Sequence, residues 1–203
     1  WIAGERGHEY SIRVHNISDV RVLAVVSVDG VNAVTGQTAA PSQSGYVIEP
    51  GDSVTIEGWR KSLARTAAFV FTSPKRSYAS RTNRPDNVGV IGVALFRERE
   101  QPPMSVAEVA REEERSASTE ADGRLAQKAA PASPSLGTGH GRSEYSPAER
   151  TSFERASDSP DQVVVLRYES RESLIALGVL PRTRVPGDRP EPFPAALGFV
   201  ADP

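Results

Sequence analysis

Short apolar segments fill the first hundred residues of this sequence, and turn-forming residues separate them. The segments are Tyr10–Val14, Val22–Val28, Tyr46–Ile48, Val54–Ile56, Ala67–Phe71 and Val88–Phe96. The first alternates apolar and polar residues, which predicts a strand with one buried face, whereas the continuous run Val22–Val26 predicts a strand covered on both faces. Roughly six to eight short strands at this spacing predict a mainly β fold, an antiparallel β-sandwich of immunoglobulin-like or Greek-key type.

Glycines mark the expected turns between these strands. Asp29-Gly30 predicts a two-residue hairpin, because both central positions of a type I′ turn need a positive φ. Pro50-Gly51 predicts a second turn, between the segments 46–48 and 54–56. Gly89 and Gly92 in the last apolar segment indicate a bulge or a close approach of another backbone.

The composition divides the chain into three parts. Residues 1–99 hold the predicted β-sandwich and are slightly basic, whereas the rest of the chain is acidic. Residues 100–136 are rich in Ser, Ala and Pro, and we expect a partly helical, acidic linker with a helix over 106–115. Residues 137–203 are expected to form a small C-terminal extension.

A helix–strand–helix order is predicted for this extension. Ser146 begins a capping box that predicts a helix as far as Ala156, Val163–Leu166 reads as a buried strand, and Ser170 is expected to cap a second helix. Such a piece is too small for a core of its own. We therefore expect it to dock on a β-sandwich, of its own chain or of a neighbouring copy, by adding its strand to an open sheet edge.

The composition argues against several classes of site. The chain has no Cys, which excludes disulfides and thiolate chemistry. His8, His15 and His140 lack metal-ligand spacing, and no phosphate-loop or nucleophile-elbow pattern occurs, so we predict no metal and no cofactor. The net charge of −2 argues against general attraction to nucleic acid or to lipid. No apolar run approaches about 18 residues, so no membrane partner is expected. The absence of Cys is compatible with either the cytoplasm or the periplasm. Because the chain begins at Trp1 rather than Met, we expect a fragment or a processed form.

The most specific charge pattern is a stretch without acids between Glu57 and Asp86. It contains Arg60, Lys61, Arg65, Lys75, Arg76, Arg81 and Arg84, with Trp59 and Tyr78 interleaved. One interpretation is a surface for a polyanion or an acidic partner, including the chain's own acidic linker, and the other is a set of solvated loops. A Trp that ends a strand is more often a core residue than a ligand platform.

A second candidate is the glycine-rich segment Leu136–Arg142. Its glycines could present backbone N–H groups to an anion beside His140 and Arg142, but the segment fails both phosphate-loop patterns. We expect a flexible or docking turn. Together with the basic residues above and Tyr78, His140 and Arg142 complete the candidate binding residues.

Several segments resemble a family of uncharacterised bacterial proteins. They are Gly7–Tyr10, Leu23–Asn32, Gly45-Tyr46, Pro50-Gly51, Ile56–Arg60, Asn87–Val93, and Leu136–Arg142 with the helix expected after it. The resemblance covers about two-thirds of the chain, excluding the linker. It implies a bacterial origin and relatives with the same two-part layout, and it brings no activity and no catalytic residue.

From these observations we expect a non-enzymatic module for protein–protein interaction or assembly. Further copies of the chain are among the expected partners, with the C-terminal extension as a clamp within or between chains. The alternative is a small-ligand or anion-binding module, or an enzyme, with a site near Trp59, Arg60, Tyr78, Arg81 and the turn at Gly137–Arg142. Nucleic-acid binding through residues 60–84 is a weaker third hypothesis. A concave pocket at these residues would favour the alternative, and a flat basic face would favour assembly.

Overall fold

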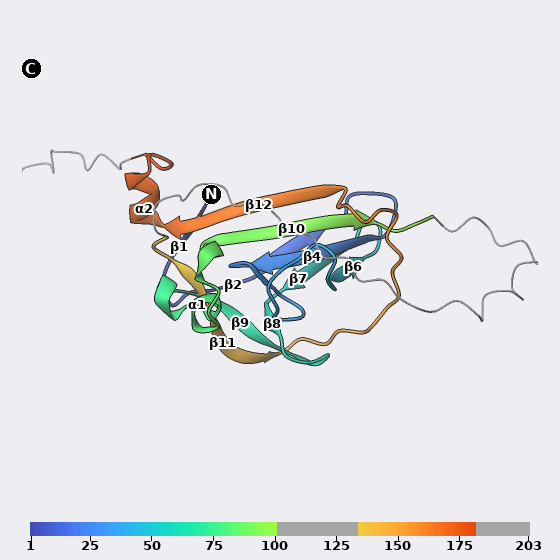
Figure 1. The fold of residues 1–203 in the computed structure, drawn as a ribbon, viewed down its shortest axis with the longest axis horizontal. Helices are drawn as coiled ribbons and strands as arrows, with labels where there is room; N and C mark the ends of the chain where they lie inside the picture. Colours follow the sequence, from blue (N-terminus) through green and yellow to red (C-terminus); the bar gives the residue numbers. More distant parts are fainter. Residues whose placement is uncertain (101–133, 182–203) are drawn as a thin grey trace, which may run out of the picture.

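The computed structural model describes residues 1–100 and 134–181, and this part of the chain is mainly β (Figure 1). Its strands are β1 (Ile2–Gly4), β2 (Glu9–Tyr10), β3 (Ile12–His15), β4 (Val22–Val28), β5 (Val31–Asn32), β6 (Tyr46–Ile48), β7 (Ser53–Ile56), β8 (Gly58–Arg60), β9 (Arg65–Thr72), β10 (Val90–Arg97), β11 (Gly137–Tyr145) and β12 (Gln162–Ser170). The short helices are η1 (Pro74–Arg76), α1 (Tyr78–Arg81), η2 (Pro85–Asn87) and α2 (Arg171–Ala176).

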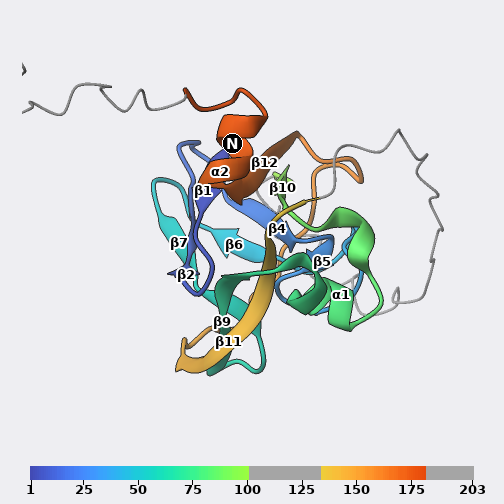
Figure 2. The same ribbon diagram turned by 90° about the vertical axis from the view of Figure 1, so that its left-hand side faces the viewer.

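The strands form three sheets. The largest has the order β1-β12-β10-β4-β5, with β6 also paired to β4. A second sheet has the order β11-β9-β2, with β8 also paired to β9, and β3 pairs with β7 alone. All pairings are antiparallel except that of β1 with β12, which is parallel. Figures 1 and 2 show β12, β10 and β4 side by side, with β9 and β11 on the other side of the molecule.

One hydrophobic core joins these sheets. Val26, Val28 and Ile91 from the largest sheet pack in the same buried cluster as Phe69 and Phe71 from β9. The continuous apolar run in β4 is buried along nearly its whole length, as predicted for a central strand. On the other face of this sheet, Leu23 and Val25 of β4 form a smaller cluster with Ala94 and Phe96 of β10. Phe153 packs against this cluster.

The turn predictions agree with the backbone. Asp29 and Gly30 have φ values of 52° and 75°, and Val28 pairs with Val31 across them, as the hairpin requires. Gly89 has a φ of 91° directly before β10. The predicted strand Tyr10–Val14 divides at Ser11, because β2 pairs with β9 whereas β3 pairs with β7.

The C-terminal part differs from the prediction in its first elements. The helix expected from Ser146 to Ala156 is wrong, since no helix is assigned there. The backbone N–H groups of Ser146 and Ala148 instead donate to Ala64 and Leu63, at 2.9 and 2.7 Å, so tertiary partners take the amides near the expected helix start. The glycine-rich turn expected at Leu136–Arg142 is also wrong, because these residues lead into and form most of β11.

The strand and the second helix predicted further along agree with the structure in position. The strand predicted at Val163–Leu166 is part of β12, which adds to β10 of the same chain. The expectation that this strand is buried is wrong, because no strand covers its far side and Val163, Val165 and Leu166 are exposed. The Ser170 side chain accepts from the Ser173 N–H at the start of α2, and Gly178, with a φ of 73°, lies just beyond its end. The described extension therefore has the order strand–strand–helix. The helix expected over 106–115, and most of the linker, lie outside the described residues.

Candidate functional site

Asp29 is the centre of a buried hydrogen-bonded cluster that joins the β4–β5 turn to both C-terminal strands. Its Oδ1 accepts from the Gly89 N–H at 2.9 Å and from the Tyr168 hydroxyl at 2.5 Å. Its Oδ2 accepts from the Thr138 N–H at 2.7 Å. The Thr138 hydroxyl continues the cluster to the hydroxyl groups of Tyr168, at 2.8 Å, and of Tyr10, at 2.6 Å.

Burial dominates the electrostatics of this cluster. Asp29, Thr138 and Tyr168 are each 0% exposed. Burial raises the pKa of the Asp29 carboxyl above its ordinary value, and the hydrogen bonds that it accepts oppose this rise. Burial, together with the nearby Asp29, also raises the pKa of Tyr10 and of Tyr168. A cluster so enclosed fixes β11 and β12 against the turn, and the sequence pointed to Asp29 only as a turn residue.

The strand held by this cluster, β12, has an open edge. Strand β10 pairs along one side of β12 from Gln162 to Arg167. On the other side, β1 covers only Tyr168–Ser170. In the described part of the chain no strand pairs with β12 along Gln162–Arg167 on that side, and Figure 1 shows β12 at the rim of the sheet.

The direction of the free backbone groups follows from one hydrogen bond. The Tyr168 N–H donates to the Gly89 carbonyl next to β10, at 3.0 Å. Backbone groups alternate in direction along an antiparallel ladder, so Val163, Val165 and Arg167 direct theirs to the open side. Their amides and carbonyls are therefore available to another strand.

The side chains at this edge are apolar and uncovered. Val163 and Val165 are 57% and 56% exposed, on the outer face of the sheet. Only small residues lie next to Val165 across the sheet. Gly92 of β10 lies opposite Val165, and Ser27 of β4 lies opposite Gly92. Natural sheet edges are usually protected by Lys, Pro or a bulge, and Gln162–Leu166 contains neither Lys nor Pro.

The predicted basic residues separate into two groups. Lys75, Arg76, Arg81 and His140 line one shallow hollow of about 530 Å³, together with Val70, Thr72, Gly139 and Gly141. Tyr78 lies between His140 and the buried Trp59: its ring centroid is 5.9 Å from that of His140 and 5.0 Å from that of Trp59, and both ring pairs are tilted. Trp59 itself is 3% exposed, so it is a core residue rather than a ligand platform.

The other group has partners within the chain. Arg60 donates to the Ser146 carbonyl at 2.5 Å, and Arg84 donates to the Gly36 carbonyl at 3.0 Å. Arg142 forms an ion pair with Glu9 at 3.0 Å, and a second with Glu144. Two further residues lie exposed outside both groups: Lys61, in the loop after β8, and Arg65, the first residue of β9. The sequence could not distinguish these groups, because the carbonyls and Glu9 come from distant segments.

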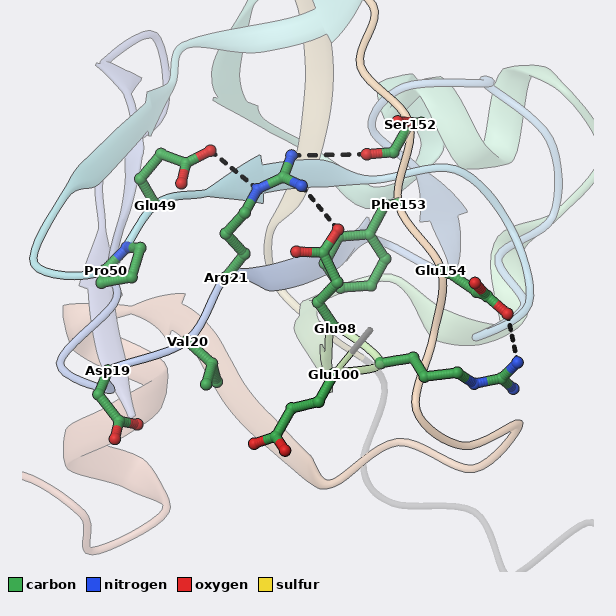
Figure 3. A pocket seen from close by; sticks show the side chains of 11 residues that line it. Asp19, Val20, Arg21, Glu49, Pro50, Glu98, Glu100, Ser152, Phe153 and Glu154 are labelled. Carbon is green, nitrogen blue, oxygen red and sulfur yellow. Dashed lines mark hydrogen bonds and ion pairs between the residues drawn. The ribbon is translucent and has the colours of Figure 1, made fainter. Parts of the chain in front are cut away.

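A second hollow, of about 660 Å³, lies around Arg21 (Figure 3). The Arg21 guanidinium donates to Glu49 at 2.8 Å and to Glu98 at 2.6 Å. It also reaches the Ser152 carbonyl at 3.5 Å. The bond to Ser152 attaches the segment between β11 and β12 to the body, and the Arg21 guanidinium already has partners within the chain.

Residues 1–100 and 134–181 contain no group of three or more His, Asp or Glu side chains arranged to hold a metal ion. No helix within these ranges combines the length and apolar character needed to cross a bilayer.

Comparisons of the chain with protein-family models, with curated proteins and with solved structures found no match. The function is therefore inferred from the geometry of these sites alone.

Proposed function

We propose that this chain is a non-enzymatic β-sandwich module that assembles by pairing the open edge of β12 with β12 of a second copy. The observation that carries this proposal is the exposed apolar edge formed by Val163 and Val165, whose backbone groups point away from β10. An edge of this kind is a template for another strand. The clamp role of the C-terminal extension is then twofold: β12 completes its own sheet and offers its far edge to the partner.

The sandwich part of the proposal is supported by the shared core. Side chains of β4 and β10 on one side, and of β9 on the other, lie in one buried cluster. Two sheets that pack face to face bury the inner residues of both and direct polar residues outward. Val163 and Val165 are apolar residues on an outer face, and in this proposal the partner copy contacts them.

The register of the pair follows from the chemistry of the strand. In an antiparallel pair with two-fold symmetry about Val164, Val163 of each copy lies opposite Val165 of the other. These are the residues whose free N–H and C=O groups face outward, so they exchange hydrogen bonds as a narrow pair. Their side chains meet on the outer face as an apolar cross-strand pair.

Charge complementarity favours the same register. Symmetry about Val164 brings Asp161 of each copy opposite Arg167 of the other, so both ends of the pair have opposite charges. Symmetry about Val163 would bring Arg167 opposite Ser159, and symmetry about Val165 would bring it opposite Val163. The Asp161 side chain is 37% exposed and already interacts with Arg97: its Oδ1 lies 3.9 Å from the guanidinium, and its Oδ2 accepts from the Arg97 N–H at 2.8 Å. In the dimer Asp161 would meet Arg167 in addition to Arg97, and no ion pair involves Arg167 within the described residues.

The experiment is the mass of the full chain in solution, measured by light scattering over a range of concentrations. We expect a monomer–dimer equilibrium that Val165→Lys shifts toward monomer by about tenfold or more in dissociation constant. Each Lys would replace one partner of an apolar pair with Val163 of the other copy, and the two Lys side chains would be diagonal neighbours of like charge. Ile17→Lys is the matched control, since Ile17 is 89% exposed and lies in the loop between β3 and β4.

Two results would overturn the proposal. One is a monomeric wild-type chain at every concentration, and the other is an equal effect of Val165→Lys and Ile17→Lys. A monomer whose β12 edge instead captures an extended segment of a different protein would also overturn self-assembly, and it would leave a binding module that uses the same edge.

A further inference from the structure

The basic hollow between η1, α1 and β11 lies apart from the β12 edge, and assembly leaves it unexplained. Its basic side chains come from three elements: Lys75 and Arg76 from η1, Arg81 from the end of α1, and His140 from β11. No Asp or Glu lines it. In the described part of the chain, Lys75, Arg76 and Arg81 take part in no ion pair.

Two glycines of β11, Gly139 and Gly141, line the hollow beside Val70 and Thr72 of β9. A Cβ at Gly141 would lie 2.6 Å from the Val70 side chain and 2.8 Å from the Ala68 carbonyl, so only glycine allows this approach to β9. A Cβ at Gly139 would lie 3.2 Å from Thr72. The ladder between β11 and β9 shifts its register between His140 and Ser143, and Gly141 lies within this bulge. Bulges re-aim a side chain, and here the exposed one beside the cations is His140.

The electrostatics of His140 agree with a positive environment. Burial lowers the pKa of its imidazole, and the positive charges of Lys61 and Arg81 lower it further. The groups that act on the ring are all cations, with Lys75 and Arg76 on the same hollow. A multiply charged anion bound there would reverse this effect, since it would favour the imidazolium.

We propose that this hollow binds a small, multiply charged anion that carries phosphate groups through Lys75, Arg76, Arg81 and His140. Guanidinium groups bind phosphate oxygens with two parallel hydrogen bonds, and Lys adds a point charge. A volume of about 530 Å³ lies in the range of small-molecule sites.

A small ligand fits these observations better than a nucleic acid does. Arg60, Arg84 and Arg142, which would extend the basic surface, are held by partners within the chain. The chain has a net charge of −2, so the hollow is a local positive patch rather than a basic stripe that follows a backbone.

The test is an NMR titration of the full-length chain with inorganic pyrophosphate at low ionic strength. We expect saturable shifts of the Gly139, His140 and Gly141 amides, and a rise in the pKa of the His140 imidazole when the ligand is bound. The double variant R76Q/R81Q should weaken binding by about tenfold or more, because two charged hydrogen-bond donors are lost at exposed positions. Arg13→Gln, on β3, is the matched control.

The pH dependence supplies an independent readout. Binding to the wild-type chain should strengthen, relative to His140→Gln, as the pH falls below the ordinary imidazole pKa of 6.5, because only the wild-type ring gains a charge. The proposal is overturned if pyrophosphate causes only linear shifts spread over many basic residues, or if R76Q/R81Q and Arg13→Gln behave alike. It is also overturned if a single-stranded oligonucleotide binds the same residues far more tightly than pyrophosphate does.

Discussion

The Tyr168 hydroxyl donates to the Asp29 carboxylate across 139 residues of sequence, at 2.5 Å and with both side chains fully buried. Tyr168→Phe removes this donor and leaves Asp29 Oδ1 with only the Gly89 N–H. We expect a loss of about 1.5–3 kcal/mol in the free energy of unfolding, since the bond involves a buried charged acceptor. Urea denaturation measures it. Tyr145→Phe, at a side chain that is 73% exposed, is the control and should change little. Equal stability of the two variants would contradict the role of the cluster.

The pH dependence of stability provides a second prediction, for Asp29→Asn. Because burial raises the pKa of Asp29 in the folded state, the native chain binds this proton more tightly than the unfolded chain does. The resulting stability is fully present below the unfolded pKa of about 3.8 and is lost as the pH rises through the folded pKa. Asparagine keeps the tolerated positive φ but cannot titrate. The stability of the wild type relative to D29N should therefore decrease with rising pH, and denaturation of both proteins across the acidic range checks this. A constant difference would contradict it.

Local patterns predicted most of the strands because their signals lie within a few residues. The continuous run in β4 and the Asp29-Gly30 pair each specify a conformation without reference to the rest of the chain. The Ser146 capping box is an equally local signal, but the amides of Ser146 and Ala148 donate to the loop between β8 and β9. A distant segment thus overrode the helix preference.

The candidate sites show the same limit. Glycines at 137, 139 and 141 suggested a turn, yet they form a strand whose close packing against β9 and η1 requires their missing side chains. The sequence identified the acid-free basic stretch, and it could not separate Arg76 and Arg81, which line the hollow, from Arg84, which donates to Gly36. It also predicted that the strand at 163–166 joins a sheet edge, but which edge stays open depends on the short parallel strand β1.

The close contact at Gly141 leads to a third prediction. Gly141→Ala places a Cβ against the Ala68 carbonyl, a backbone atom that cannot move without disturbing β9. Overpacking of this kind costs about 1–3 kcal/mol, and thermal unfolding should show it as a lower Tm. Gly92→Ala is the matched change in a neighbouring sheet, because its Cβ would meet only Ser27, at 3.8 Å. The expectation fails if both variants unfold at the wild-type temperature.

The register proposed for the β12 pair can be tested by exchanging charges between copies. Arg167→Glu places a second carboxylate opposite Asp161 at both ends of a homodimer, and Asp161→Arg places two guanidinium groups together at both ends, so each variant alone should dissociate. A mixture of the two variants restores an opposite-charge pair at each end, and we expect it to form a heterodimer. Exposed pairs of this kind contribute roughly 0.2–1 kcal/mol each, so the heterodimer should predominate at low salt and weaken as salt is added. Native mass spectrometry of copies that differ in isotope label measures the ratio of homodimer to heterodimer. Because registers centred on Val163 or Val165 do not bring Asp161 opposite Arg167, a mixture that stays monomeric while the wild type dimerises would exclude the Val164-centred register.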